Sequence, residues 1–349
     1  MNYSQSELFY GLFAAISIVT LVTVVILRRN SEFIVISSSY RSPLSPAHEW
    51  LARLLGGLWV LAGLLQTQPS MIDHFANNIL TPLVSAEPIF LKVMVIWGIK
   101  LWSLNPVLWD EFATWIQIGI GLAILLGGSG RIRRIGLYLS LVWGLIVWIS
   151  GEALGSIFVH GSWLVGSPGS AFLYALAAIS LLQPVRFWTS GRARRAFQWS
   201  FATLWFLSAF LQVLPSSGWW NPSTLSAYVE SMVEMAQPGF LSAPLYIWAH
   251  MLNIHPLLWN AVLVMVFTAL GVLWLAKPRA PMTWWLTVFV TVATWWLGQD
   301  FGVLGGMGTD PNSGSIVLGG LIAYARLLPG MVWQQDHSSK SQHKTMLSG

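Results

Sequence analysis

The sequence predicts an all-α membrane protein with about nine transmembrane helices: one N-terminal helix followed by two parallel four-helix units. Three observations support this fold class. The chain of 349 residues is 55% hydrophobic and only 9% charged, whereas soluble globular domains carry about 25% charged residues. Its apolar residues form segments of the length that a bilayer requires. Its two halves repeat the same features in the same order.

Nine apolar segments have lengths close to the roughly 17–25 residues that a helix needs to cross a bilayer. They cover residues 8–27, 50–66, 106–127, 135–156, 169–185, 198–213, 256–276, 282–300 and 313–329. The 22 tryptophans fit this setting, because Trp gathers at both membrane interfaces. The lipid bilayer is therefore the expected main partner of the chain.

The Lys and Arg residues predict the orientation of the chain. Sixteen of the 18 fall on one side of the nine segments, and only Lys92 and Lys100 fall on the other. Because positively charged loops stay in the cytoplasm, we expect a multi-pass protein of a prokaryotic-type cell membrane with its N-terminus outside and its C-terminus cytoplasmic. The same distribution explains the net charge of +5 without a nucleic-acid partner. The arginines that follow the first segment predict a reversed signal anchor and not a cleaved signal peptide.

An ordered internal duplication defines the domain organisation. The segment LWVLAGLLQTQP at 58–69 matches LWFLSAFLQVLP at 204–215, and later matches follow at offsets between 143 and 150. Four spanning helices in each unit, an even number, predict parallel repeats that share one orientation. The predicted domains are an N-terminal helix with a cytoplasmic linker, a first unit, a second unit and a polar cytoplasmic tail, at 1–49, 50–190, 191–331 and 332–349.

Each unit also contains a long and largely uncharged segment between its first and second spanning helices, at 67–105 and 214–255. Parts of both segments place their apolar residues on one helical face. We therefore expect short helices that lie at the outer membrane interface.

Glu152 and Asp300 are the strongest candidates for catalytic residues. They occur in the matching stretches WISGEALG at 148–155 and WWLGQDFG at 295–302, near the outer ends of two predicted spans. Gln299 is the direct alignment partner of Glu152. An ionisable residue inside a span is costly and marks a functional candidate. The two acids are expected to line an outward-facing pocket between the units, where they transfer protons or hold a polar headgroup. The alternative is that both lie at the interface and contact water or Arg.

Further residues are predicted to complete this pocket. Hydrogen-bond partners and aromatic walls are expected from Gln66, Gln212, Gln299, Trp148, Trp295 and Trp296. The simpler explanation for Gln66 and Gln212 is that they end their helices at the interface. Asp310 precedes Pro311, as Ser167 precedes Pro168 in the first unit, so helix capping is its expected role and ligand contact is the alternative.

Metal chemistry is not expected. The absence of cysteine excludes disulfides, thiolate catalysis and Cys-ligated metal sites. The outer histidines His74, His160, His250 and His255 include no pair at i, i+4 spacing, which would place two ligands on one helical face. The sequence therefore predicts no metal site.

Two glycine-based motifs resemble the DoxX/DoxD superfamily of four-helix membrane proteins. One motif is Arg53-x-x-Gly56-Gly57 followed by Gly63-x-x-Gln66, and the other runs from Gln117 through Gly121 to Gly127. The resemblance covers about 50–185 and, more faintly, 198–329. That family usually has Glu at the position of Gln117, and the second unit keeps only Gly271, so this chain departs from the pattern.

The resemblance implies a membrane bundle with quinone-linked or other redox partners, since DoxD-like members are subunits of thiosulfate:quinone oxidoreductase. The leading expectation is therefore a redox-associated membrane subunit that binds a quinone near its outer face and has a redox partner subunit. The alternatives are a small-solute carrier with its site between the repeats, and a non-catalytic anchor or assembly subunit. Whether the chain is an enzyme stays open.

Overall fold

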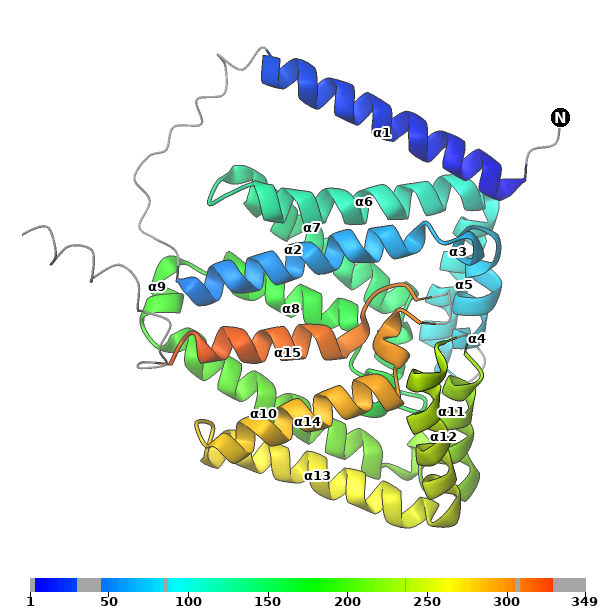
Figure 1. The fold of residues 1–349 in the computed structure, drawn as a ribbon, viewed down its shortest axis with the longest axis vertical. Helices are drawn as coiled ribbons and strands as arrows, with labels where there is room; N and C mark the ends of the chain where they lie inside the picture. Colours follow the sequence, from blue (N-terminus) through cyan, green and yellow to red (C-terminus); the bar gives the residue numbers. More distant parts are fainter. Residues whose placement is uncertain (1–3, 30–44, 85–86, 236, 305–307, 329–349) are drawn as a thin grey trace, which may run out of the picture.

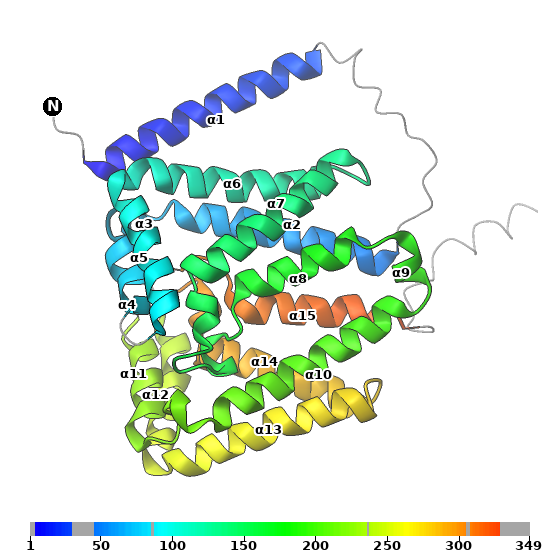
Figure 2. The same cartoon turned by 180° about the vertical axis from the view of Figure 1, so that it is seen from behind.

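The structure, a computed structural model, describes residues 4–29, 45–84, 87–235, 237–304 and 308–328. The described residues form helices and no strands, which confirms the predicted all-α class. Long helices run side by side through the molecule, and shorter helices lie across one end of the bundle (Figures 1 and 2). The predicted linker residues 30–44 and the predicted tail at 332–349 lie outside the described residues.

Each of the nine predicted segments overlaps one of the nine longer helices. The helices are α1 Gln5–Arg29, α2 Pro46–Gln66, α6 Pro106–Leu126, α7 Arg131–Ser150, α8 Ser170–Leu182, α10 Arg192–Val213, α13 Pro256–Ala276, α14 Pro281–Leu297 and α15 Asn312–Ala325. Helices α6, α7, α13 and the part Gln5–Val22 of α1 are long and apolar enough to cross a membrane. These long apolar helices indicate membrane insertion, and the full set of nine spans stays a prediction.

Helices α8 and α15 are shorter than a bilayer requires. They contain 13 and 14 residues, which at 1.5 Å per residue corresponds to about 20 Å, against a hydrocarbon core of about 30 Å. Each is preceded by a segment without a long helix, described at 151–169 for α8 and at 298–304 and 308–311 for α15. The two loops carry most of the candidate site.

Helices α7 and α14 end earlier than predicted, at Ser150 and Leu297. The residues that follow them include Ala153 and Asp300, which have positive φ angles of 46° and 47°. A right-handed helix cannot continue through such residues. Glu152 and Asp300 therefore lie in loops beyond the helices, and not inside the spans where the sequence placed them.

The short helices occupy the connecting segments where they were expected. They are α3 Pro69–Phe75, the π-helical turn η2 Ala76–Leu80, α4 Thr81–Val84, α5 Ile89–Leu104, α11 Pro222–Val233 and α12 Gly239–Ile254. Both groups lie across the same end of the bundle (Figure 1). The remaining short elements are η3 Ala153–Ser156, η4 Trp163–Val165, α9 Val185–Thr189, η5 Pro215–Ser217 and η6 Asp300–Gly302.

The two units use equivalent helix pairs. Helix α2 packs along α6, as α10 packs along α13, and α7 packs on α8, as α14 packs on α15. The units also interlock. Ile316 and Ala323 of α15 belong to the hydrophobic core of the first unit, and Trp163 from the first unit lies in the core of the second.

Glycine permits the closest approach of α2 and α6. A Cβ atom on Gly121 would lie 2.6 Å from the carbonyl oxygen of Gly56, whereas a Cβ on Gly119 of the same helix would meet nothing within 4 Å. Small residues of this kind let helix backbones pack tightly in membranes. The glycine motif that carries the family resemblance therefore has a packing role in this chain.

We expect Gly121→Ala to destabilise the protein by about 1–3 kcal/mol, because the added methyl group forces α2 and α6 apart. The matched control is Gly119→Ala, which should be neutral or stabilise by up to about 1 kcal/mol through helix propensity. Thermal unfolding of both variants in the same detergent tests this. Equal melting temperatures for the two variants would contradict the role of Gly121 in the α2–α6 contact.

Candidate functional site

The loops after α7 and α14 have the same backbone conformation. Three successive positions have positive φ angles in both loops: 46°, 57° and 68° at Ala153, Leu154 and Gly155, and 47°, 56° and 72° at Asp300, Phe301 and Gly302. This register makes Gln299 the structural counterpart of Glu152, and Asp300 the counterpart of Ala153. Asp300 is therefore an acid that only the second unit carries.

Each loop packs against the turn that precedes the next helix, and this contact requires glycine. A Cβ atom on Gly155 would lie 2.1 Å from the carbonyl oxygen of Pro168, and a Cβ on Gly302 would lie 2.3 Å from that of Asp310. Both glycines also have positive φ angles, which other residues rarely adopt. The close packing holds Glu152 and Gln299 at the start of α8 and α15.

The three tryptophans predicted to wall the pocket have another role. The indole N–H of Trp148 donates to the Pro168 carbonyl oxygen at 2.7 Å, and that of Trp295 donates to the Pro311 carbonyl oxygen at 2.7 Å. The indole N–H of Trp296 donates to Leu241. None of these three tryptophans occurs among the described residues that line the cavities next to Glu152. Trp148 and Trp295 anchor the turns that precede α8 and α15, and Trp296 joins α14 to α12.

Glu152 and Asp310 meet at one serine hydroxyl. Ser170 Oγ lies 2.6 Å from Glu152 Oε1 and 2.5 Å from Asp310 Oδ2. Ser170 and Glu152 belong to the first unit and Asp310 to the second. A hydroxyl has one proton to donate, so both short contacts are hydrogen bonds only when one carboxyl group is itself protonated. The geometry thus favours one proton shared across Glu152, Ser170 and Asp310.

Electrostatics support this shared proton. Both acids lie outside the helices, in the loops at the end of the bundle. Burial raises the pKa of the Glu152 carboxyl, and the charge of Asp310 raises it further. Burial also raises the pKa of the Asp310 carboxyl. Two adjacent carboxylates in a poorly solvated site cannot both ionise easily, so the pair retains a proton at pH values where exposed acids have lost theirs.

Asp300 occupies a separate acidic position. Gln237 Nε2 donates to Asp300 Oδ2 at 3.0 Å, and burial raises the pKa of this carboxyl to about 6. The neighbouring Gln299 uses its amide N–H to bind the Trp163 carbonyl oxygen at 2.9 Å. Gln299 and Asp300 are only 5% and 2% exposed. The hydrogen bonds of Asp300 thus involve neither Ser170 nor the acid pair.

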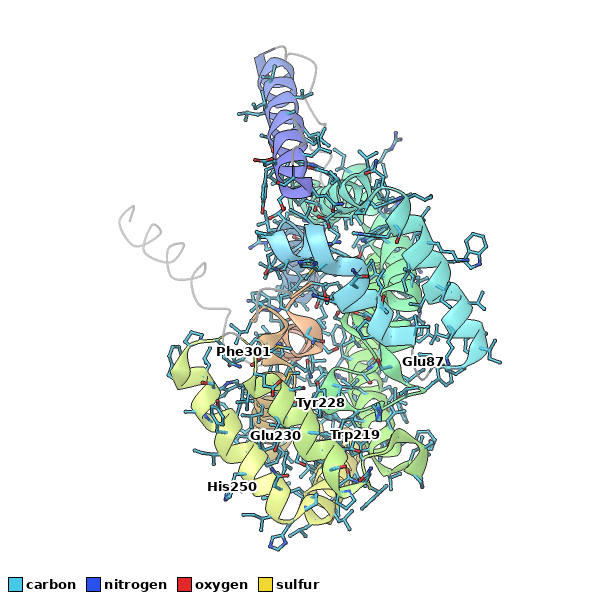
Figure 3. The ribbon with its side chains drawn as sticks, turned by 90° about the vertical axis from the view of Figure 1, so that its right-hand side faces the viewer. Glu87, Trp219, Tyr228, Glu230, His250 and Phe301 are labelled. Atoms are coloured by element: carbon cyan, nitrogen blue, oxygen red, sulfur yellow. The ribbon has the colours of Figure 1, made fainter. Side chains whose placement is uncertain are left out.

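Two cavities meet at the acid pair. The interunit cavity, of about 470 Å³, is lined by both units and includes Glu152, Ser170, Gln299, Asp300 and Asp310. Figure 3 looks onto this end of the molecule, where Phe301 of η6 lies between the α3–α5 group and the α11–α12 pair, with Tyr228 beside it on α11.

The second cavity, called the aromatic cavity here, lies within the first unit. It has a volume of about 210 Å³, and its walls include Trp59, Trp102, Trp109, Phe112 and Trp143. Glu152 and Asp310 line this cavity as well as the interunit cavity. The acid pair therefore forms the wall that the two cavities share.

The two predicted glutamines fall in equivalent places with different surroundings. Gln66 lines the aromatic cavity and donates to Asp110 Oδ1 at 2.6 Å. Gln212 donates to Asn260 Oδ1 at 2.6 Å and accepts a hydrogen bond from Ser162. Gln212 is fully buried in the second unit and lines neither cavity. The partners of Gln212 come from both units, Ser162 from the first and Asn260 from the second, and they occupy both ends of its amide.

The second unit fills the space that the first unit leaves open. Phe267 takes the position of Gln117 in the repeat, and Leu263 takes that of Ala113. Phe267 is fully buried and its ring stacks on Trp205 with centroids 5.9 Å apart. The first unit has the smaller Ala113 and the polar Gln117 at the wall of its aromatic cavity.

The sequence predicted ligand contact by Asp310 only as the alternative to helix capping, and it did not single out Ser170 or Trp143. Asp310 does assist the start of α15, since its Oδ1 accepts from Asn312 N at 2.6 Å. Comparison of the two repeats contained a signal for a further role of Asp310. The second unit has an acid in DPNS where the first has the serine of SPGS, and a capping role alone does not require that change.

Among the residues that the structure describes, no group of three or more His, Cys, Asp or Glu side chains is placed to hold a metal ion. The polar groups that line the two cavities are carboxyl groups, amides, serine, threonine and tyrosine hydroxyls and indole N–H donors. In comparisons with known proteins, the chain matches no family model, no curated protein and no solved structure.

Proposed function

We propose that the chain is a DoxX/DoxD-like membrane subunit that binds a quinone-like redox lipid in the aromatic cavity. It crosses a prokaryotic-type cell membrane nine times, with its N-terminus outside and its C-terminus in the cytoplasm. The motifs around Gly56, Gly121 and Gln66 support the family resemblance, and the one-sided distribution of Lys and Arg supports the orientation. A separate redox subunit is the expected electron partner.

One observation carries this proposal. Two buried polar atoms on residues that line the aromatic cavity have no hydrogen-bond partner: the donor Trp143 Nε1 and the acceptor Glu152 Oε2. A buried group without a partner costs about 1–3 kcal/mol. A quinone offers carbonyl oxygens that accept from Trp143, and its reduced form offers hydroxyl groups that donate to Glu152. The residues present therefore fit both forms of such a ligand.

The shape of the cavity supports a lipid ligand. Small-molecule sites combine apolar and aromatic walls with a few polar groups that fix orientation. Leu101, Phe112 and Ile146 line the cavity and are about half exposed on the surface of α5, α6 and α7. The opening therefore lies on an apolar face of the bundle. An isoprenoid tail would leave the cavity through this face and enter the lipid.

The acid pair supplies the proton chemistry that this ligand needs. A bound quinone supplies two-electron, two-proton redox chemistry. Glu152 holds a proton beside the aromatic cavity, and Ser170 links it to Asp310. Both acids also line the interunit cavity, which lies at the end of the bundle covered by the short helices. Protons would pass between the two cavities through these carboxyl groups.

In the nine-span topology, the loops that follow α7 and α14 lie at one face of the membrane. The described residues of both loops line the interunit cavity. The end that carries α3–α5 and α11–α12 would then be the outer face.

A small-solute carrier is the second candidate function. The observation that favours it is the interunit cavity, because sites between parallel repeats are common in transporters. A non-catalytic anchor or assembly subunit is the third, and it would show a requirement for a neighbouring subunit without a bound ligand.

Organic extraction and mass spectrometry of the gently purified protein tests the proposal. We expect a near-stoichiometric quinone in the wild type and its loss in Gln117→Phe, which copies Phe267 of the second unit and fills the cavity. Trp143→Phe keeps an aromatic wall and removes only the donor, so it should weaken quinone binding by about tenfold. Glu152→Gln should lower occupancy by a similar factor.

The control is Glu234→Gln, which changes an exposed acid just after α11 that lines neither cavity. It should retain quinone at the wild-type level. Ordinary lipid alone, identical in the wild type and all variants, would contradict the quinone proposal and favour the carrier or anchor function.

A further inference from the structure

The interunit cavity has a chemical bias that quinone binding does not explain. Two buried atoms on residues that line this cavity and not the aromatic cavity have no hydrogen-bond partner: Gln299 Oε1 and Asp300 Oδ1. Both are acceptors. No lysine, arginine or histidine occurs among the described residues of its lining. A ligand that completes this cavity must therefore bring hydrogen-bond donors and positive charge.

Gln299 adds an uncharged acceptor to the acids of the interunit cavity, because its amide oxygen has no hydrogen-bond partner. Its N–H side is used by the Trp163 carbonyl oxygen, which leaves Oε1 directed away from that bond and without a partner. Gln299 and Asp300 both line this cavity, and an amide oxygen together with a carboxylate binds an ammonium group, which has three donors and no acceptor.

The ligand is an organic cation, for two reasons. The cavity volume of about 470 Å³ is far larger than a single ion requires, and its walls include Ile79, Leu83, Val165, Met232 and Leu304. Apolar walls of this kind suit methylene groups. In addition, the described residues provide no group of three or more His, Cys, Asp or Glu side chains placed to hold a metal ion.

The two acidic positions define the number of charges. Asp300 is bonded to Gln237, and Asp310 is bonded to Ser170 with Glu152, so the two positions share no partner. We propose that the interunit cavity binds a short linear aliphatic diamine, with one ammonium at Asp300 and Gln299 and the other at Asp310 beside Glu152. The methylene chain lies along the apolar wall between the two positions.

The charge state of the cavity is compatible with this ligand. Burial raises the pKa of Asp300 to about 6, so this carboxyl is mostly ionised at neutral pH. An ammonium group bound beside it would lower its pKa again. The shared proton between Glu152 and Asp310 leaves about one negative charge at the other position. Two positive charges would therefore meet about two negative charges.

The test is binding of putrescine to the purified full chain in nanodiscs, measured by titration calorimetry and by thermal shift. Butylamine is the matched probe, since it has the same carbon chain and one ammonium. We expect putrescine to bind at least roughly tenfold more tightly than butylamine, because each charge-assisted hydrogen bond contributes that much or more. Asp300→Asn should weaken the binding of putrescine by at least roughly tenfold. It should leave the weaker binding of butylamine close to its wild-type value.

Asp310→Asn is the second variant and should weaken putrescine by a similar factor, while Glu234→Gln should leave binding unchanged. Equal binding of putrescine and butylamine, equal binding by the wild type and both cavity variants, or no binding of either amine would overturn the proposal. Loss of putrescine binding when phosphatidylethanolamine replaces phosphatidylglycerol in the nanodiscs would also overturn it, because the site would then take a lipid ammonium. Gln117→Phe should retain putrescine, so this test is separate from the quinone proposal.

Discussion

Replacing Trp163 with alanine is expected to lower the free energy of unfolding by about 3–5 kcal/mol, the range for removal of a fully buried large aromatic side chain. Trp163 lies in η4, in the loop between α7 and α8 of the first unit, and its side chain is fully buried. It inserts into the core of the second unit. Its ring contacts Trp205 with centroids 5.4 Å apart, and its indole N–H donates to Thr294 Oγ1 at 2.9 Å.

The effect of this substitution should extend beyond the cavity that it leaves. The Trp163 carbonyl oxygen accepts from Gln299, so the loop that holds Trp163 also positions one wall of the interunit cavity. We therefore expect Trp163→Ala to weaken the contact between the two units as well as the second core. A loss of compactness that precedes helix unfolding would be the signature.

Denaturant unfolding in detergent, followed by circular dichroism and by small-angle scattering, measures both effects. Trp199→Ala is the matched control, because Trp199 is 60% exposed on α10 and its removal should change stability by no more than about 0.5 kcal/mol. The loss of unfolding free energy in Trp163→Phe should lie between those of Trp163→Ala and Trp199→Ala. If Trp163→Ala and Trp199→Ala destabilise equally, Trp163 does not join the units.

The melting temperature is expected to fall as pH rises from about 5 to about 8, and Asp310→Asn should remove much of this fall. Acids with a raised folded-state pKa retain protons that the unfolded chain releases. The stability they contribute is fully present below the ordinary carboxyl pKa and is lost as pH rises through the raised values. Glu152, Asp300 and Asp310 all have raised pKa values because of burial.

The size of the fall follows from the same linkage. Each unit by which a pKa is raised corresponds to about 1.4 kcal/mol, and 1 kcal/mol moves the melting temperature of a chain of this size by roughly 1–2 °C. A total fall of about 5 °C or more is therefore expected for the wild type. Asp310→Asn removes one acid and also the charge that raises the pKa of Glu152.

The controls separate the acid pair from general effects of pH. Asp300→Asn should remove only the part of the fall that occurs below about pH 6. Glu7→Gln, which changes an exposed acid at the start of α1, should show the wild-type profile. A profile in Asp310→Asn that is parallel to the wild type over the whole range would contradict the shared proton.

The helices and their order could be predicted from the sequence because their causes are local. Pro46, Pro106, Pro256 and Pro281 occupy the first turns of their helices, where proline is preferred. Apolar runs between them set the lengths. The repeated motifs also placed Gln299 opposite Glu152, and the backbone angles of the two loops show the same register.

The ends of α7 and α14 were predicted less well. Glu152 and Asp300 continue an apolar run, so length alone extended both helices through them. Positive φ angles at Ala153 and Asp300 end the helical path, and two residues later the loops pack closely at Gly155 against Pro168 and at Gly302 against Asp310. The pattern of apolar residues along the chain does not predict such a contact.

The sequence by itself determined the all-α class, the likeness between the two halves, and the presence of acids at one end of the bundle, since these depend on composition and on neighbours along the chain. Only the tertiary structure decided which acids meet. Ser170 and Asp310 are 140 residues apart, and Trp163 and Thr294 are 131 residues apart. Contacts over such separations depend on how α15 and the loop of Trp163 cross between the units. Equivalent residues of the repeat, such as Gln66 and Gln212, have different partners because aromatic rings fill only one of the two bundles.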